Sequence, residues 1–199
     1  MGLSAMTAFG VLTGEHWNKF DMNKKIGLFY GSTTCYTEIA AEKICATINR
    51  MLGPKTVRLH NLAFDSVSLM SNYNHLIMGI PTWDYGELQE DWETQWDTLS
   101  TVNLRSKSIA LFGLGDQIGY PEWFQDALGY LWHRVVHLGA TTVGEWPNTG
   151  YDFIESKALN REKNVFVGLA LDEENQFEII DDLIFRWSTQ IVTEFGLSP

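Results

Sequence analysis

The stretch KIGLFYGSTTCYTEIAAEKICATINRML, residues 25–52, joins a short apolar run to an amphipathic pattern through a loop rich in hydroxyl groups. Residues 25–30 are typical of a buried strand, and the apolar residues after Thr37 recur at helical spacing. Gly53 and Pro54 are expected to end that helix. A strand, a loop and a helix in this order predict the opening unit of an alternating α/β fold.

The rest of the chain repeats this alternation. Apolar runs predict strands at residues 56–59, 76–80, 108–113 and 141–143, with a second strand of the fifth region at residues 164–169. Pro81 is expected to end the third strand. Helices are predicted around residues 92–99, over residues 124–138 and from about residue 178 to residue 195. Strands that are apolar throughout and alternate with helices predict a doubly wound, five-stranded parallel sheet covered on both faces.

Size and charge limit the function classes. The 199 residues suit one domain, which we place at residues 23–199. We interpret residues 1–22 as an N-terminal extension: a tag, a fusion remnant or an annotated extension of the natural start. A net charge of −11 argues against nucleic acid. Two cysteines without a C-x-x-C pair predict a cytoplasmic location, and no apolar run reaches the roughly 18 residues of a membrane span.

Three loops follow predicted strands at the edge where a doubly wound sheet binds ligands. The first, residues 31–37, is called the hydroxyl loop here and carries four hydroxyl side chains: Ser32, Thr33, Thr34 and Thr37. Together with the free N–H groups and dipole of the next helix, they favour a bound phosphate. The loop lacks the lysine of a Walker motif. The alternative is simple helix capping. Cys35 could act as a nucleophile, but a packing role is favoured.

The second loop, Pro81-Thr82-Trp83-Asp84-Tyr85-Gly86-Glu87, presents an aromatic side chain at a strand end. No lysine or arginine occurs between Arg58 and Arg105, whereas seven acidic residues do. An aromatic face stacks on a flat ligand, and an acidic field disfavours added negative charge. The alternative is a core or interface tryptophan, which is the role expected of Trp92, Trp96, Trp132 and Trp187.

The third loop, Gly113-Leu114-Gly115-Asp116-Gln117-Ile118-Gly119-Tyr120, is called the tyrosine loop here. Its glycines permit close approach of backbone to a ligand, and Tyr120 offers a second aromatic face, with a surface tyrosine as the alternative. His133 and His137 have the spacing of metal ligands on a helix. Both lie off the apolar stripe of their helix, so a solvated face is expected.

These loops, in this order, resemble those of the flavodoxins, small electron carriers that hold FMN. The similarity runs from about residue 23 to residue 197, and residues 150–173 resemble the insertion that splits the fifth strand in the long-chain subgroup. Within that subgroup, the motifs at residues 79–83, 115–120 and 167–173 are most similar to the second flavodoxins of gamma-proteobacteria. The resemblance implies a flavodoxin-like fold with strand order 2-1-3-4-5.

The resemblance also implies a cofactor site with no catalytic residue and no metal. Ser32, Thr33, Thr34 and Thr37 would bind the FMN phosphate, Trp83 and Tyr120 would enclose the ring, and the Asp84–Tyr85 peptide would lie near the flavin N5. Two residues of the hydroxyl loop depart from the family pattern, which has Gly at Cys35 and often Lys at Tyr36. Asp84 replaces a more usual Asn. The remaining expected contacts are Cys35, Tyr36, Pro81, Thr82, Gly86, Gly113, Leu114, Gly115 and Asp116.

The function expected from these features is one-electron transfer at low potential by non-covalently bound FMN, between the neutral semiquinone and the anionic hydroquinone. Expected partners are redox proteins with a basic docking face, namely a flavodoxin reductase and acceptor enzymes, with the chain as a monomer. One alternative is an FMN enzyme of the NAD(P)H-quinone reductase type, whose substrates the two aromatic faces would block. A phospho-receiver module is a third reading, but Pro81 stands where a receiver needs an aspartate.

Overall fold

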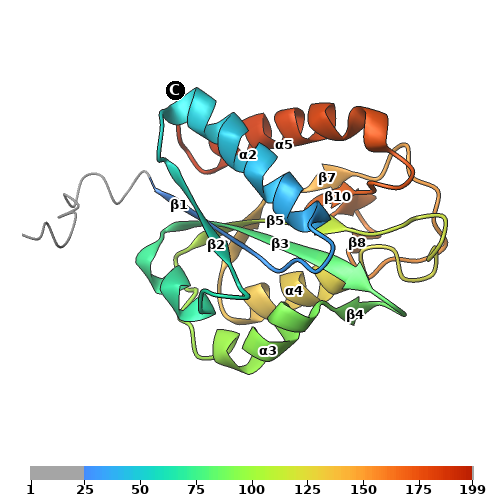
Figure 1. Ribbon diagram of the computed structural model, residues 1–199, viewed down its shortest axis with the longest axis horizontal. Helices are drawn as coiled ribbons and strands as arrows, with labels where there is room; N and C mark the ends of the chain where they lie inside the picture. Colours follow the sequence, from blue (N-terminus) through green and yellow to red (C-terminus); the bar gives the residue numbers. More distant parts are fainter. Residues whose placement is uncertain (1–24, 199) are drawn as a thin grey trace, which may run out of the picture.

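The computed structural model describes residues 25–198, and the predicted extension at residues 1–22 lies outside them (Figure 1). The main sheet has the order β10-β5-β3-β1-β2. Its parallel strands are β1 (Ile26–Tyr30), β2 (Val57–Asn61), β3 (His75–Trp83), β5 (Ser108–Leu114), β6 (Thr141–Val143) and β10 (Leu169–Leu171). The predicted doubly wound α/β fold is therefore confirmed.

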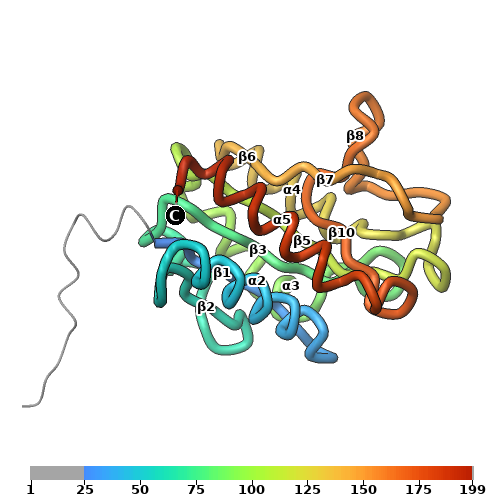
Figure 2. Tube along the Cα trace, turned by 90° about the horizontal axis from the view of Figure 1, so that it is seen from above, coloured from blue at the N-terminus to red at the C-terminus, as the bar shows by residue number. Residues whose placement is uncertain are grey.

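Two strands together occupy the fifth position of the sheet. β6 pairs with the first half of β5, from Ser108 to Ala110, and β10 pairs with its second half, from Phe112 to Leu114. Between them the chain forms a small antiparallel sheet in the order β7-β9-β8. Figure 2 shows the segment that carries β8 projecting from the body of the molecule. Its strands are β7 (Trp146–Pro147), β8 (Leu159–Asn160) and β9 (Val165–Phe166).

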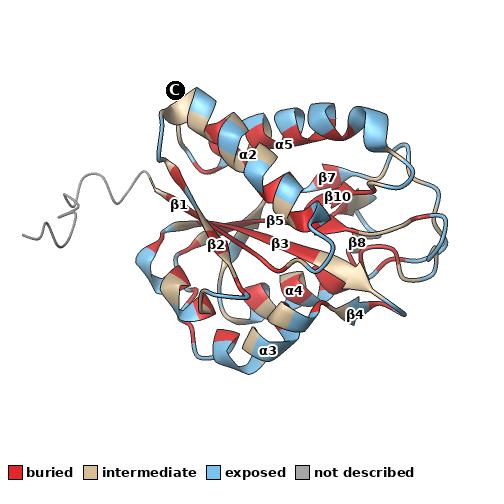
Figure 3. Ribbon diagram, in the orientation of Figure 1, coloured by how far each residue is buried: buried red, intermediate tan, exposed pale blue. Residues whose placement is uncertain are grey.

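The helices cover both faces of the main sheet, as a parallel sheet requires. α2 (Tyr36–Leu52) and α5 (Ile180–Glu194) lie on one face, and α3 (Glu90–Leu99) and α4 (Asp126–His137) lie on the other (Figure 1). Short 3-10 helices, η1 (Val67–Asn72) and η2 (Phe177–Ile179), precede β3 and α5. Buried residues follow the central strands and the sheet-facing sides of the helices (Figure 3).

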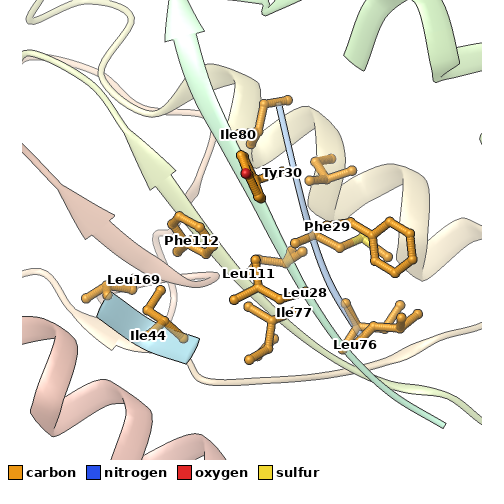
Figure 4. Close-up of a cluster of buried hydrophobic side chains, with 14 of the residues drawn as sticks. Leu28, Phe29, Tyr30, Ile44, Leu76, Ile77, Ile80, Leu111, Phe112 and Leu169 are labelled. Atoms are coloured by element: carbon orange, nitrogen blue, oxygen red, sulfur yellow. The ribbon is translucent and has the colours of Figure 1, made fainter. Parts of the chain in front are cut away.

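The core forms where these two layers meet the sheet. Leu28, Ile77 and Leu111 come from three neighbouring strands and are fully buried, and Ile44 of α2 lies in the same cluster (Figure 4). Burial of such side chains supplies about 1.5–3 kcal/mol each. Trp92 and Trp187 are also fully buried, which confirms the core role predicted for them. This rigid core sets the positions of the loops at the carboxyl edge.

Pro81 does not end the third strand. β3 continues to Trp83 and pairs with a short strand, β4 (Glu87–Leu88), so the expected loop is a tight hairpin. Its turn is closed by a hydrogen bond from the Gly86 N–H to the Trp83 carbonyl at 3.0 Å. Proline is tolerated because β1 pairs with β3 only as far as Gly79, so the position of Pro81 has no strand on that side.

Two further boundaries differ from the prediction. The single strand expected at residues 164–169 divides between β9, in the small sheet, and β10, in the main sheet. The division occurs at Gly168, where a Cβ atom would lie only 2.2 Å from the Leu111 carbonyl oxygen of β5. Phe124 precedes α4 instead of lying in it, because Gln125 adopts φ 62 and turns the chain before the helix begins.

Candidate functional site

The hydroxyl loop leads directly into α2 and presents groups suited to an anion. The helix begins at Tyr36, after Cys35 with φ 69 and ψ −11, and the first N–H groups of a helix have no acceptor within it. The Ser32 hydroxyl oxygen is buried and has no hydrogen-bond partner among the described residues. An unpaired buried hydroxyl beside a helix N-terminus fits the phosphate of the cofactor that the resemblance implies.

A residue that the sequence analysis did not identify holds this loop against α3. Gln89 is 2% exposed, and its amide nitrogen donates to the Thr33 hydroxyl at 3.1 Å. Its amide oxygen accepts from the backbone of Asp91 at 3.1 Å, so Gln89 also caps α3. The backbone at Gly31 lies so close to Gln89 that a Cβ atom added to Gly31 would be 2.1 Å from the Gln89 side-chain oxygen. The position of Gln89 before the acidic turn of a helix is the sequence signal for this role.

The ends of β3 and β5 and the start of α2 surround a pocket of about 290 Å³ at the carboxyl edge of the sheet. We call it the edge pocket. Trp83 and Tyr120, the two predicted aromatic faces, both line it. The pocket brings together residues predicted from three separate loops, namely Thr34, Tyr36, Thr37, Pro81, Thr82, Trp83, Asp84, Leu114, Gly115, Asp116 and Tyr120.

Six predicted contacts lie outside the lining of the edge pocket. Ser32, Thr33 and Cys35 belong to the hydroxyl loop just before α2. Tyr85 packs edge-on against Trp123 at 5.1 Å between ring centroids. Tyr85 and Gly86 line a separate groove between α3 and α4. Gly113 is buried, and an added Cβ there would meet the Gln125 side-chain oxygen at 2.1 Å.

Four residues line the edge pocket that the sequence analysis did not include: Trp123, Phe124, Glu173 and Glu174. Trp123 and Phe124 follow Tyr120 closely, so their proximity in the chain was an available signal. The two glutamates follow β10, which reaches the pocket only because the split fifth strand returns beside the end of β5. No local pattern in the sequence indicates that return.

All the charged side chains that line the edge pocket are acidic. Its lining includes the carboxylates of Asp84, Asp116, Glu173 and Glu174 and contains no lysine or arginine. Burial raises the pKa of Glu173 above its ordinary value. Burial would also raise the pKa of Asp116, but hydrogen bonds from the Gly119 N–H, the Asn175 amide and the Ile118 N–H outweigh it and lower that pKa. Adding negative charge to this pocket is therefore costly.

The structure also tests the roles predicted for His133, His137 and Cys35. His133 and His137 are exposed on α4, as predicted. The described part of the chain contains no group of three or more histidine, cysteine or acidic side chains placed to hold a metal ion. The packing role favoured for Cys35 is wrong, because its side chain is exposed. Its left-handed backbone at the helix start places it on the surface and away from the core.

Comparison of the chain with known proteins identifies its family. The model of the family described as flavodoxin matches residues 28–187. The chain belongs to the flavodoxin family. Flavodoxin 2 of Escherichia coli (strain K12) is 54% identical over 171 residues, which cover 86% of this chain and 96% of that protein. A flavodoxin of Nostoc sp. (strain PCC 7120 / SAG 25.82 / UTEX 2576) is 48% identical over 176 residues, 88% of this chain and all of that flavodoxin.

The fold agrees with solved flavodoxins. A crystal structure of Fusobacterium nucleatum flavodoxin bound to flavin mononucleotide matches with a TM-score of 0.80 and 31% identity, over 86% of this chain and 99% of that one. The similarity to long-chain flavodoxins inferred from the motifs is thus confirmed. In the part of the chain that the structure covers, no helix combines the length and apolarity needed to cross a membrane.

Proposed function

We propose that this flavodoxin binds FMN non-covalently in the edge pocket and carries single electrons at low potential between a reductase and acceptor enzymes. The observation that carries the proposal is a pocket with five aromatic residues, Trp83 and Tyr120 among them, four carboxylates and no lysine or arginine, next to a helix N-terminus with an unpaired buried hydroxyl. FMN supplies the one-electron chemistry, and the protein supplies binding, orientation and electrostatics. On this reading the chain is an electron-transfer protein and not an enzyme.

The hydroxyl loop holds the phosphate. Ser32, Thr34 and Thr37 offer hydroxyl donors, and the first turn of α2 offers N–H groups. Gln89 keeps the Thr33 hydroxyl in place. Because Tyr36 stands where the family often has Lys, the loop has no basic side chain, and only its hydroxyl and N–H dipoles stabilise the phosphate. A lysine-free site of this kind suits a phosphate that anchors a cofactor and is not transferred.

The aromatic and acidic residues serve the ring. Trp83 and Tyr120 provide stacking faces and exclude water, with Trp123 and Phe124 extending the apolar lining. The four carboxylates then oppose added negative charge. One carboxylate about 10 Å away, at an effective dielectric of about 40, opposes an added electron by ~0.8 kcal/mol. This corresponds to about 35 mV for a one-electron couple, so several carboxylates lower the last potential substantially.

The negative charge of the chain and of the pocket indicates the kind of partner that it binds. A chain with net charge −11 and an acidic pocket edge attracts a basic docking face on a reductase or an acceptor enzyme. We further propose that the protein acts as a monomer in the cytoplasm, where its unpaired cysteines, Cys35 and Cys45, stay reduced.

Titration of the apoprotein with FMN, followed by flavin fluorescence, tests binding. A potentiometric titration of the complex then tests the electrostatics: two separated one-electron steps are expected, the second well below that of free FMN. Unchanged flavin fluorescence, or a second step at the free-FMN value, would refute the proposal. Steady turnover of NAD(P)H and quinone by the purified protein alone would instead support the quinone-reductase alternative, which the aromatic lining disfavours.

A further inference from the structure

Asp172 is a fully buried carboxylate that the proposed function does not use. It follows β10 directly and is 0% exposed. Among residues 25–198, no lysine, arginine or histidine forms an ion pair with it. A buried charge without a counterion is costly unless hydrogen bonds compensate for it. The bonds that Asp172 accepts therefore indicate its role.

All of these bonds come from amide groups at one end of the sheet. One carboxylate oxygen accepts from the Gln117 backbone N–H at 3.0 Å and from the Gln117 side-chain amide at 2.7 Å. The other accepts from the Asn175 backbone N–H at 3.0 Å. The Asn175 side-chain amide lies 2.9 Å from Asp172 and also 2.9 Å from Asp116. Asp172 is thus bonded to the tyrosine loop both directly and through Asn175.

Asp116 continues the hydrogen bonds toward Tyr120. Its carboxylate accepts from the Ile118 N–H at 3.0 Å and from the Gly119 N–H at 2.7 Å. Its backbone carbonyl accepts from the Tyr120 N–H at 3.1 Å. The Asp116 carboxylate, which holds the Ile118 and Gly119 N–H groups, is therefore linked to the buried Asp172 carboxyl group through the Asn175 amide. The strands β5 and β10, which carry the two ends of this network, lie side by side in the sheet (Figure 1).

The insertion between β6 and β10, residues 144–168, contacts Gln117 of the tyrosine loop on the side opposite Asp172. The Asp152 N–H donates to the Gln117 side-chain oxygen at 2.6 Å, so the Gln117 amide is bonded on both sides. No residue between Gly144 and Gly168 lines the edge pocket. The insertion therefore reaches the pocket indirectly, through its hydrogen bond to Gln117 and through Tyr151 and Phe153, whose rings pack against the pocket residue Phe124.

We propose that Asp172 is a positioning residue for the ring of the cofactor: it orients the Gln117 amide and the Asp116 carboxylate and so places Tyr120 at the edge pocket. This inference rests on the proposed function, because it assigns Asp172 to the ring side of the same flavin site. It does not assign Asp172 to the phosphate side.

The test uses Asp172→Asn, which keeps the shape of the side chain but replaces one acceptor oxygen with an NH2 group, so that at least one N–H donor of Gln117 or Asn175 loses its acceptor. Asp152→Asn is the matched control, because it makes the same change on an exposed side chain while the backbone bond to Gln117 persists. Both variants are titrated with FMN and with riboflavin, which lacks the phosphate. We expect Asp172→Asn to weaken both ligands about tenfold, which equals ~1.4 kcal/mol, and the control to match the wild type.

The ratio of the two dissociation constants distinguishes the two sides of the site. It reports the phosphate contribution and should keep its wild-type value in Asp172→Asn. Riboflavin affinity within twofold of the wild type, or a changed ratio, would overturn the proposal. If Asp172→Asn does not fold, Asn175→Ala provides the test from an exposed position, with an expected loss of about threefold for both ligands.

Amide hydrogen exchange in the ligand-free protein gives an independent readout. The Gln117, Ile118 and Gly119 N–H groups should exchange faster in Asp172→Asn and Asn175→Ala, whereas those of α2 should not change. Equal exchange in wild type and variants would refute the positioning role. If the wild type binds neither ligand, the proposed function fails, and the exchange experiment still decides whether Asp172 orders the loop.

Discussion

Cys35→Gly tests the physical cost of the chain's departure from the family pattern in the hydroxyl loop. Cys35 adopts φ 69 and ψ −11, and a left-handed conformation costs a non-glycine residue roughly 1–2 kcal/mol. Glycine removes this cost but gives the unfolded chain more freedom, which offsets about 0.4–1 kcal/mol. The Cys35 side chain is exposed and has little packing to lose. The expected net gain in unfolding free energy is therefore about 0.5–1 kcal/mol.

Urea unfolding of the ligand-free protein measures this gain. With a denaturant slope of about 2 kcal/mol per molar, the midpoint should rise by about 0.3–0.5 M. Cys35→Ala is the matched control: it removes the thiol but keeps the Cβ atom, so it should retain the backbone cost and gain nothing. A Cys35→Gly midpoint at or below that of Cys35→Ala would refute the reasoning.

Three other variants address the edge pocket. Trp83→Ala should weaken FMN and riboflavin alike by about 10- to 100-fold, through loss of stacking and apolar contact; fluorescence titration checks this, with the exposed Tyr130→Ala on α4 as a control. Asp84→Asn should raise the potential of the second one-electron step by about 35 mV at low salt and by less at high salt; an unchanged potential at low salt would contradict the electrostatic argument. Glu173→Gln should remove a pH dependence of stability. Burial raises the pKa of Glu173 from its ordinary value of 4.5, so its stabilising contribution is complete below that value and is lost as the pH rises through the raised pKa. Thermal unfolding should find Glu173→Gln more stable than the wild type at neutral pH, with no advantage below about pH 4; a constant difference across this range would contradict the assignment.

The order of the elements was predictable because each strand of a covered parallel sheet is apolar along its whole length. Leu28, Ile77 and Leu111 lie in three such runs, and all three are fully buried in adjacent strands. The boundaries that failed depended on neighbours. Pro81 stays within β3 because β1 ends beside Gly79, and Gly168 divides the last strand because β5 passes against it. Neither neighbour is visible from local sequence.

The sequence by itself determined the alternating α/β fold, the hydroxyl loop, the aromatic residues at Trp83 and Tyr120 and the acidic character around them. Each of these depends on residue type and short-range spacing, which local physical chemistry interprets directly. The tertiary structure alone decided which side chains support them. Gln89 contacts Thr33 across 56 positions of the chain, and Asp172 contacts Gln117 across 55. Such contacts exist only after the strands have paired, because the sheet register and not the local pattern sets which distant residues meet.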